Sequence, residues 1–278
     1  MLKTVGLVAR FDNKTALQLT AELARYLNEK GLKVYIEDTL ADVVSACGEF
    51  IPLSAMKTDF ILTIGGDGTI LRACITIPKP EPPILAINMG VRGFLTEVEP
   101  KKACEAIDRI LNGEYKIEKC AKLAVTVGEE KMPDALNDVV ISACEPSKIL
   151  YAQICKNGKP ILRCQADGII MSTQTGSTGY SLSAGGPVLD QEVEALVLTP
   201  ICSLTVFHSL VFPADSTLTI NVERPSEMLV LIDGNYRKLC NANNMLKVTR
   251  SKNITSFIRF ETDFYDRLRN RLLFKGTE

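Results

Sequence analysis

Three glycines surround one acid in the sequence GGDGT at residues 65–69, which follows an apolar run at residues 60–64. Glycine lets a ligand approach the backbone closely, and the amides at a helix N-terminus attract anions. A loop that only bound phosphate would not carry a carboxylate, because like charges repel strongly in a partly dry site. Asp67 is therefore expected to handle a proton or a metal ion, which points to phosphoryl transfer. The residues expected to bind phosphate are Gly65, Gly66, Gly68 and Thr69.

Hydroxyl groups are concentrated in a second segment, residues 172–181, where seven of ten residues are Ser, Thr or Tyr. Hydroxyls and accessible backbone amides suit a polar ligand such as an adenosine moiety. An ordinary hydrophilic hairpin is the alternative. The apolar strand before this segment and the Gly-Gly-Pro after it favour a binding site.

Three shorter features are ambiguous on local grounds. Asn137 and Asp138 lie at a strand entrance, where such a pair is usually a turn or a cap. The sequence Asp-Gly-Asn beginning at Asp233 is typical of a hairpin turn. Arg92 follows the fourth expected strand, where it either binds phosphate or lies in solvent as an ordinary loop arginine.

Two kinds of pattern divide the chain. Residues 1–115 alternate between strands and helices, which predicts a Rossmann-like α/β domain with a parallel sheet. Residues 116–259 contain short strands separated by turns, which predicts a β-rich domain, β-sandwich-like, with two packed sheets. A helix at residues 263–273 is expected to pack back on the first domain, within a returning segment at 260–278. The expected early strands are 4–9, 32–36, 59–64 and 83–88, and the expected early helices are 14–30, 69–76 and 101–111. The later expected strands are 121–127, 138–142, 149–156, 160–164, 168–172, 217–222, 228–232 and 247–250.

Composition excludes several classes of protein. The 278 residues include 32 basic and 33 acidic side chains, so no net field attracts nucleic acid or an anionic membrane. The apolar runs fall short of the ~20 residues that span a bilayer, and the N-terminus reads as a strand rather than a signal peptide. Nine cysteines without Cys-x-x-Cys spacing indicate buried thiols in a reducing, cytoplasmic compartment. The single His208 argues against zinc hydrolysis and a Ser-His-Asp triad.

Taken together, these segments resemble the NAD kinases, which phosphorylate NAD to NADP. The glycine-acid turn alone also resembles phosphofructokinase-like and lipid kinases, so the discrimination comes from a series of motifs that spans most of the chain. That series comprises GGDGT at 65–69, NMG at 88–90, GFLT at 93–96, LND at 136–138, DG at 167–168, TGSTGYSLSAGGP at 175–187, LTPIC at 198–202 and DG at 233–234.

The resemblance implies an N-terminal α/β domain, a β-rich C-terminal domain, and NAD bound in a cleft, often across a subunit contact. Asp67 matches the acid thought to deprotonate the 2′-hydroxyl of the adenosine ribose. Mg²⁺ or another divalent cation would be held mainly by substrate phosphates, with ATP or polyphosphate as donor, in a homodimer or homotetramer. The remaining matched positions are Gly68 and Phe94 at the cleft, Asn137 and Asp138 at ribose and diphosphate, Thr175, Thr178, Gly179, Tyr180 and Ser183 in the adenosine-side segment, Asp167 near adenine and Asp233 near the nicotinamide ribose.

The chain departs from the family pattern at a few positions. Gln174 stands where the family usually has Pro, and Gly179 replaces the commoner Ala. Gln165 stands where Arg is common. Ser203-Leu204 and Ser209-Leu210 occupy places where many members have Pro-His and Arg-Pro, so the role of that arginine does not transfer.

Two other functions remain open at this stage. A lipid or sugar kinase would share the glycine-acid turn, although the sequence shows no apolar groove or sugar-phosphate site. A non-catalytic dinucleotide sensor would bind NADP without transferring phosphate, but a sensor gains nothing from retaining Asp67.

Overall fold

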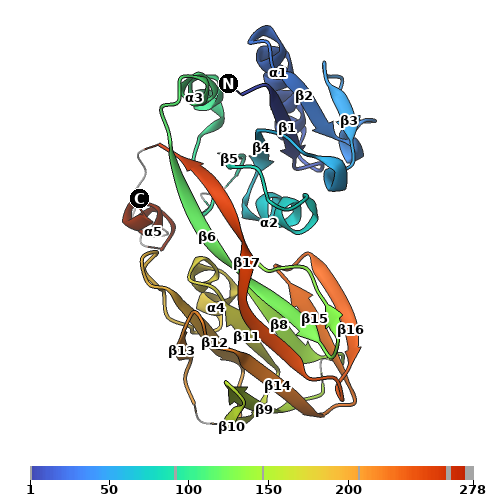
Figure 1. Ribbon diagram of the computed structural model, residues 1–278, viewed down its shortest axis with the longest axis vertical. Coiled ribbons are helices and arrows are strands. Elements are labelled where there is room, and N and C mark those ends of the chain that lie inside the picture. The colour runs from blue at the N-terminus through green and yellow to red at the C-terminus, as the bar shows by residue number, and fades with distance from the viewer. Residues whose placement is uncertain (1, 91–92, 146, 206, 261–263, 273–278) are drawn as a thin grey trace. The chain divides into compact units, whose positions relative to one another are not determined.

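The computed structural model describes residues 2–90, 93–145, 147–205, 207–260 and 264–272 (Figure 1). Their contacts divide the chain into two compact units. Unit 1 comprises Met1–Cys120 and Thr255–Glu278, and unit 2 comprises Ala121–Ile254. The chain returns to unit 1 along the strand β17 (Leu246–Arg259), so unit 1 is built from two segments that are distant in sequence.

Unit 1 contains a parallel sheet, as the alternating pattern predicts. Its strands follow the spatial order β3-β2-β1-β4-β5, and the end of β17 adds to β5 in parallel where Phe257 pairs with Ile84. The short strand β3 was not expected from the sequence. The bounds are β1 (Thr4–Ala9), β2 (Lys33–Glu37), β3 (Glu49–Ile51), β4 (Phe60–Gly65) and β5 (Ile84–Asn88).

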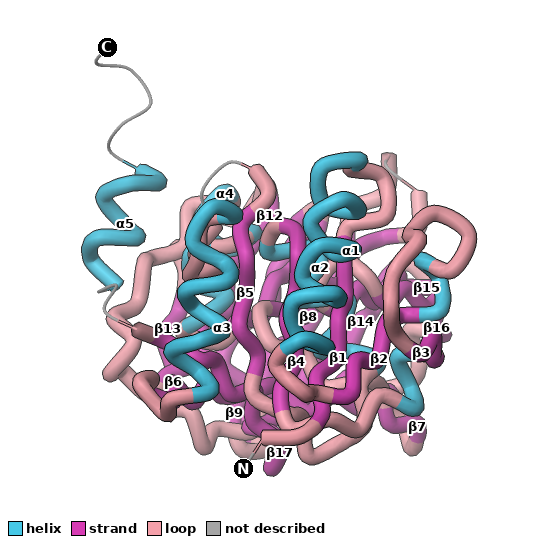
Figure 2. Tube along the Cα trace, turned by 90° about the horizontal axis from the view of Figure 1, so that it is seen from above, coloured by secondary structure: helices cyan, strands magenta, loops and turns pink. Residues whose placement is uncertain are grey.

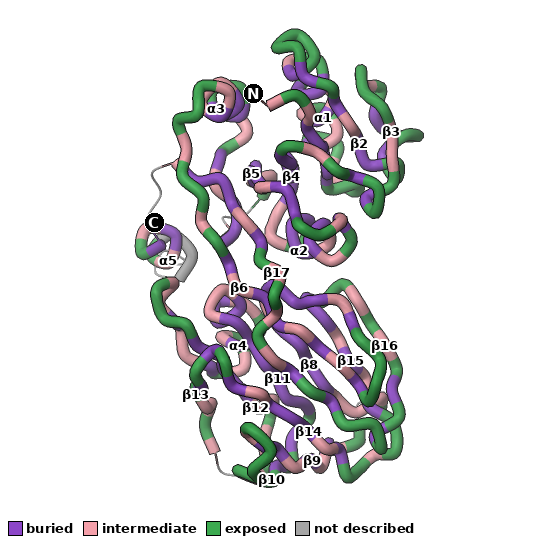
Figure 3. The backbone as a smooth tube through the Cα atoms, viewed as in Figure 1, coloured by how far each residue is buried: buried purple, intermediate pink, exposed green. Residues whose placement is uncertain are grey.

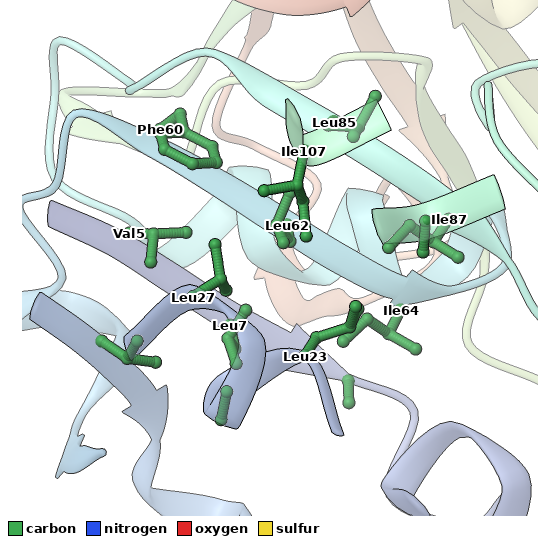
Figure 4. Close-up of a cluster of buried hydrophobic side chains, with 14 of the residues drawn as sticks. Val5, Leu7, Leu23, Leu27, Phe60, Leu62, Ile64, Leu85, Ile87 and Ile107 are labelled. Atoms are coloured by element: carbon green, nitrogen blue, oxygen red, sulfur yellow. The ribbon is translucent and has the colours of Figure 1, made fainter. Parts of the chain in front are cut away.

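Two helices of unit 1 cover the same face of this sheet. The helix α1 (Lys14–Glu29) starts where the Asn13 side chain accepts the Ala16 N–H at 3.0 Å, which is an N-cap. Buried residues of α1 and of α3 (Ala103–Leu111) belong to one apolar cluster with alternate residues of β1, β4 and β5. Figure 2 shows both helices running alongside the strands, and Figure 4 shows Leu23, Leu27 and Ile107 directed at strand residues such as Leu7 and Leu62.

The remaining helical segments of unit 1 are short. The helix α2 (Asp67–Thr76) begins two residues earlier than expected, directly at the acid of the glycine-rich turn. The helix α5 (Phe264–Leu272) confirms the expected C-terminal helix. Three 3₁₀ turns complete the unit: η1 (Asp38–Leu40), η2 (Leu53–Ala55) and η3 (Pro100–Lys102).

Unit 2 is an antiparallel β structure, which confirms the β-rich prediction. One sheet has the order β13-β12-β11-β8-β15-β16, and β9 joins β10 to β14, which pairs with β17. Figure 3 shows buried residues along the inner strands β8 and β11. The bounds are β6 (Lys116–Val127), β7 (Glu130–Lys131), β8 (Asp138–Ala143), β9 (Leu150–Lys156), β10 (Lys159–Ala166), β11 (Gly168–Ser172), β12 (Ala195–Ile201), β13 (Leu210–Pro213), β14 (Leu218–Arg224), β15 (Glu227–Ile232) and β16 (Tyr236–Asn241).

The structure corrects the sequence-based strand assignment in several places. The strands β7, β12, β13 and β16 were not expected, and β6 and β17 are longer than expected. The hydroxyl-rich segment is not a hairpin, because it forms the 3₁₀ turn η4 (Thr175–Thr178) and the single helical turn α4 (Tyr180–Ser183). The hairpin turn at Asp233 is confirmed: Asp233 and Gly234 have φ values of 50° and 64° between β15 and β16.

Candidate active site

The glycine-rich turn of unit 1 lies at the carboxyl end of β4, where ligands of parallel sheets gather. Gly66 is the N-cap of α2, and Asp67 is the first helical residue. A side chain added at Gly66 or Gly68 would meet no atom within 4 Å. The N-terminus of α2 therefore has open space around its first turn, which suits an anion such as phosphate.

The Asp67 carboxylate is fixed by the segment that follows β5. It accepts the Phe94 N–H at 3.0 Å and the Leu95 N–H at 3.2 Å, one on each oxygen. A Cβ at Gly93 would lie 2.1 Å from Asp67 Oδ1, so only glycine permits this approach. The sequence interpretation did not assign this role to Gly93 or Leu95, although the glycine at 93 was the available signal.

Three other residues were expected in this part of the site, namely Thr69, Phe94 and Arg92. Thr69 is buried and its hydroxyl packs against Gly65, so the side chain stabilises the glycine-rich turn. Phe94 is only 5% exposed, and its backbone N–H donates to Asp67. Arg92 lies outside the described residues.

In unit 2, a buried acid holds the entrance of β8. The Asp233 carboxylate accepts the backbone N–H groups of Leu136, Asn137 and Asp138 at 2.7, 2.7 and 3.0 Å. The hairpin turn at Asp233 therefore also positions this carboxylate to accept the backbone N–H groups of residues 136–138. The structure brings together the two acids that the sequence placed 95 residues apart.

The two acids of unit 2 differ in their electrostatic environment. Burial, and then the charge of Asp233, raises the pKa of Asp138 to about 7. Burial also raises the pKa of Asp233, although three backbone amide donors and the charge of Lys122 each act to lower it. Asp138 is therefore able to exchange a proton near neutral pH. Lys122, a fully buried lysine, was missed by the sequence interpretation.

The Asn137 side chain lies beside Asp138 and faces the hydroxyl-rich segment. A Cβ at Gly179 would lie 3.5 Å from Asn137 Nδ2 and 3.7 Å from Asp138 Oδ2. Asn137 Oδ1 and Ser172 Oγ are buried without a hydrogen-bond partner among the residues that the structure describes. Buried polar atoms are normally paired, so the Asn137 oxygen indicates a place for a donor from a ligand, such as a ribose hydroxyl.

The hydroxyl-rich segment is anchored to the same peptide. Thr173 donates its hydroxyl to Leu136 O at 2.7 Å and accepts the Gly176 N–H at 3.0 Å. Gly176 packs on the Asn137 backbone, where a Cβ would lie 2.0 Å from the carbonyl oxygen. These contacts fix the distance between the Asn-Asp pair and the turn that follows β11.

Five residues of this segment were expected to contact a ligand, and their exposure differs. Tyr180 is 47% exposed, Ser183 is also exposed, and Thr175 is half-buried. Thr178 is buried and its hydroxyl donates to Thr175 O at 3.1 Å. Gly179 is half-buried beside Asn137 and Asp138.

Asp167 is not part of this cluster. It precedes β11 and is exposed, whereas Asp138 pairs with Ser172 at the other end of that strand. At about 3.3 Å per residue, the length of β11 separates the two acids by roughly 16 Å. Any ligand contact that Asp167 makes is therefore distant from Asn137 and Asp138.

No group of three or more His, Cys, Asp or Glu side chains that could hold a metal ion occurs among the described residues. In the same part of the chain, no helix is long and apolar enough to cross a bilayer.

Comparison with known proteins identifies both halves of the chain. Residues 5–115 match the family model of the ATP-NAD kinase N-terminal domain, and residues 136–260 match that of the ATP-NAD kinase C-terminal domain. The chain is 37% identical over 277 residues to the NAD kinase of Methanothermobacter thermautotrophicus, covering 99% of this chain and 98% of that protein.

Two solved structures share the fold. The yeast NADH kinase complexed with NADH superposes with a TM-score of 0.90 at 23% identity, covering 100% of this chain and 89% of the yeast chain. An NAD kinase from Archaeoglobus fulgidus in complex with ATP gives a TM-score of 0.77 at 24% identity, covering 96% of this chain and 99% of the other.

Proposed function

The chain belongs to the NAD kinase family, and we propose that it transfers a phosphoryl group from ATP or polyphosphate to the 2′-hydroxyl of the adenosine ribose of NAD, giving NADP. The enzyme is thus a phosphotransferase that acts on an alcohol group. The observation that carries the mechanism is the Asp67 carboxylate, fixed by two backbone N–H groups at an open glycine-rich turn.

In this mechanism Asp67 orients the ribose hydroxyl and removes its proton as the new O–P bond forms. The alcohol loses its proton only as the new bond forms, so the alignment of the hydroxyl matters as well as proton transfer. A positioned general base contributes on the order of 10²–10⁴-fold. The open N-terminus of α2, with Gly65, Gly66 and Gly68, would hold phosphate oxygens, and Thr69 would support that turn from beneath.

Unit 2 would hold the dinucleotide. The unpartnered oxygen of Asn137 and the protonatable Asp138 suit a ribose and its diphosphate, and the exposed Tyr180 and Ser183 suit the adenosine side. Asp233 would act through the peptide that it holds. Asp167 would contact adenine, far along β11 from Asn137.

A divalent cation, Mg²⁺ in the first instance, would be held mainly by the substrate phosphates. Mg²⁺ is commonly bound through substrate phosphates and one or two carboxylates, and it keeps several waters. When bound, the ion neutralises the charge that develops on the transferred phosphoryl group. We also propose a cytoplasmic homodimer or homotetramer that binds neither nucleic acid nor membrane.

The decisive experiment measures NADP formation by the purified protein with NAD, Mg²⁺ and either ATP or polyphosphate. Asp67→Asn is assayed alongside and is expected to keep NAD binding while turnover falls at least ~10²-fold. Full activity of this variant would remove Asp67 from the mechanism. Turnover of diacylglycerol or fructose 6-phosphate without turnover of NAD would establish a different kinase, and tight NADP binding without any transfer would establish a sensor.

A further inference from the structure

The backbone that holds Asp67 is itself held by a buried arginine of the returning segment. Arg259, the last residue of β17, donates from a terminal guanidinium nitrogen to Leu95 O at 2.8 Å. The N–H of the same residue, Leu95, donates to the Asp67 carboxylate. Arg259 and Asp67 therefore bind the carbonyl and the amide of one residue.

Two glutamates fix the orientation of that guanidinium. Arg259 donates from Nε to Glu118 at 2.6 Å and from a terminal nitrogen to Glu97 at 3.2 Å. The Arg259 side chain is 9% exposed and that of Glu97 is 1% exposed. Charge-assisted hydrogen bonds in a dry environment are short and directional, so the guanidinium has one well-defined position.

A second arginine, on the C-terminal helix α5, completes the cluster. Arg267 lies 3.7 Å from a Glu97 oxygen and 3.5 Å from a Glu118 oxygen, and its side chain is 6% exposed. Both arginines thus pair with the same two glutamates. The docking of α5 thereby contributes to the position of Arg259.

We propose that Arg259 is a positioning residue for Asp67, acting through the Leu95 peptide, and that Arg267 on α5 supports it. The proposal rests on the function proposed above, in which Asp67 acts on the ribose hydroxyl. Nothing in the local sequence around Asp67 points to this role, because Arg259 is 164 residues away from Leu95.

The first test is the kinetics of Arg259→Lys. A lysine keeps the charge but lacks the fork that bonds the Leu95 carbonyl and both glutamates simultaneously. Since a displacement of about 1 Å can cost on the order of 10²-fold in rate, we expect kcat for NADP formation to fall by about 10- to 100-fold. The KM values for NAD and ATP should stay within about twofold, because substrate binding in the ground state does not need Asp67.

The second test separates positioning from general stability. Arg259→Lys is combined with Asp67→Asn, whose residual turnover is measured in long incubations. If Arg259 acts through Asp67, the additional loss disappears in the Asp67→Asn background. The same fold-loss in both backgrounds would overturn the proposal, as would an unchanged kcat in the single variant.

Two variants on α5 test the proposal even if Arg259→Lys does not fold. Arg267→Gln should lower kcat in the same direction and lose this effect in the Asp67→Asn background. Arg269→Gln removes an exposed arginine of the same helix that pairs with Asp266, and it should leave kcat unchanged. If the wild-type protein formed no NADP, the proposed function would fail. If the wild-type rate were normal and Arg267→Gln left kcat unchanged, only the positioning role would be contradicted.

Discussion

Two hydrogen bonds join Asp138 and Asp233, one in each direction. The Asp138 N–H donates to the Asp233 carboxylate at 3.0 Å, and the Asp233 N–H donates to the Asp138 carbonyl at 3.0 Å. The entrance of β8 and the β15–β16 turn are thus joined by hydrogen bonds in both directions, and the side chains of both acids are buried. Burial raises the pKa of Asp138 to about 7, which has consequences that can be measured.

Asp138→Asn is expected to change the pH dependence of stability. In the folded protein the pKa of Asp138 is raised to about 7, from an ordinary value of 3.8. Between these pH values the folded state binds a proton that the unfolded state has released, so the free energy of unfolding falls as pH rises from about 4 to about 7. Each unit of pKa difference corresponds to about 1.4 kcal/mol.

Asparagine does not ionise, so the stability of Asp138→Asn relative to wild type should increase across this window. Urea unfolding at pH 5, 6, 7 and 8 measures the difference. Asp42→Asn, which replaces an exposed acid, serves as the control and should follow the wild-type curve. Parallel curves for Asp138→Asn and wild type would contradict the raised pKa.

Gly93→Ala is expected to impair turnover more than stability. The added Cβ would lie 2.1 Å from Asp67 Oδ1, so the carboxylate must move away from the Phe94 and Leu95 amides. We expect kcat to fall on the order of 10²-fold. Gly90→Ala is the matched control, because its Cβ would meet no atom within 4 Å. Equal activities of the two variants would show that the position of Asp67 tolerates displacement.

Two glycines of the hydroxyl-rich segment should respond differently to alanine. In Gly176→Ala the Cβ would lie 2.0 Å from Asn137 O, and such overpacking typically costs about 1–3 kcal/mol. In Gly179→Ala the nearest atom, Gly176 O, would lie 3.2 Å away, so a small adjustment suffices. Thermal unfolding and NAD titration of both variants test this. A lower Tm for Gly179→Ala than for Gly176→Ala would contradict the packing.

Removal of divalent cations should stop turnover without unfolding the protein. In the proposed mechanism the divalent cation is bound with the substrate phosphates, so EDTA should abolish NADP formation while the Tm of the substrate-free protein stays unchanged. Excess Mg²⁺ should restore activity. A drop in Tm on treatment with EDTA would indicate a metal bound by the protein itself.

The sequence predicted the parts of the fold that depend on local patterns. The strand and helix alternation of residues 1–115, the turn at Asp233 and the placement of Asp67 at a helix N-terminus all follow from short-range spacing. The strand β12 was missed because Pro200 argues against a central strand, yet Pro200 pairs with Ile169 of β11 beyond the Ala195–Leu198 segment that pairs with β13. The strand β16 was missed because its residues are mostly polar, as suits a strand that pairs on one side only.

The sequence predicted the site residues that stand in recognisable motifs. It did not predict the residues that support the site from distant parts of the chain. Asp67, Asn137 and Asp138 stand in short recognisable segments. Lys122 and Arg259 are charged residues in strands, and such residues are usually exposed. Their burial depends on partners that are distant in sequence and become neighbours only in the folded chain, so no local pattern predicts it.

The split of unit 1 into two segments has a consequence for synthesis on the ribosome. Glu118 is translated 141 residues before Arg259. At about 5–20 residues per second, the ribosome needs roughly 7–28 s to supply the arginine after the glutamate. During that time the first segment of unit 1 lacks the Arg259 hydrogen bonds to Glu118 and to the Leu95 carbonyl. The support of the peptide that binds Asp67 is therefore completed only after the second segment of unit 1 has been translated.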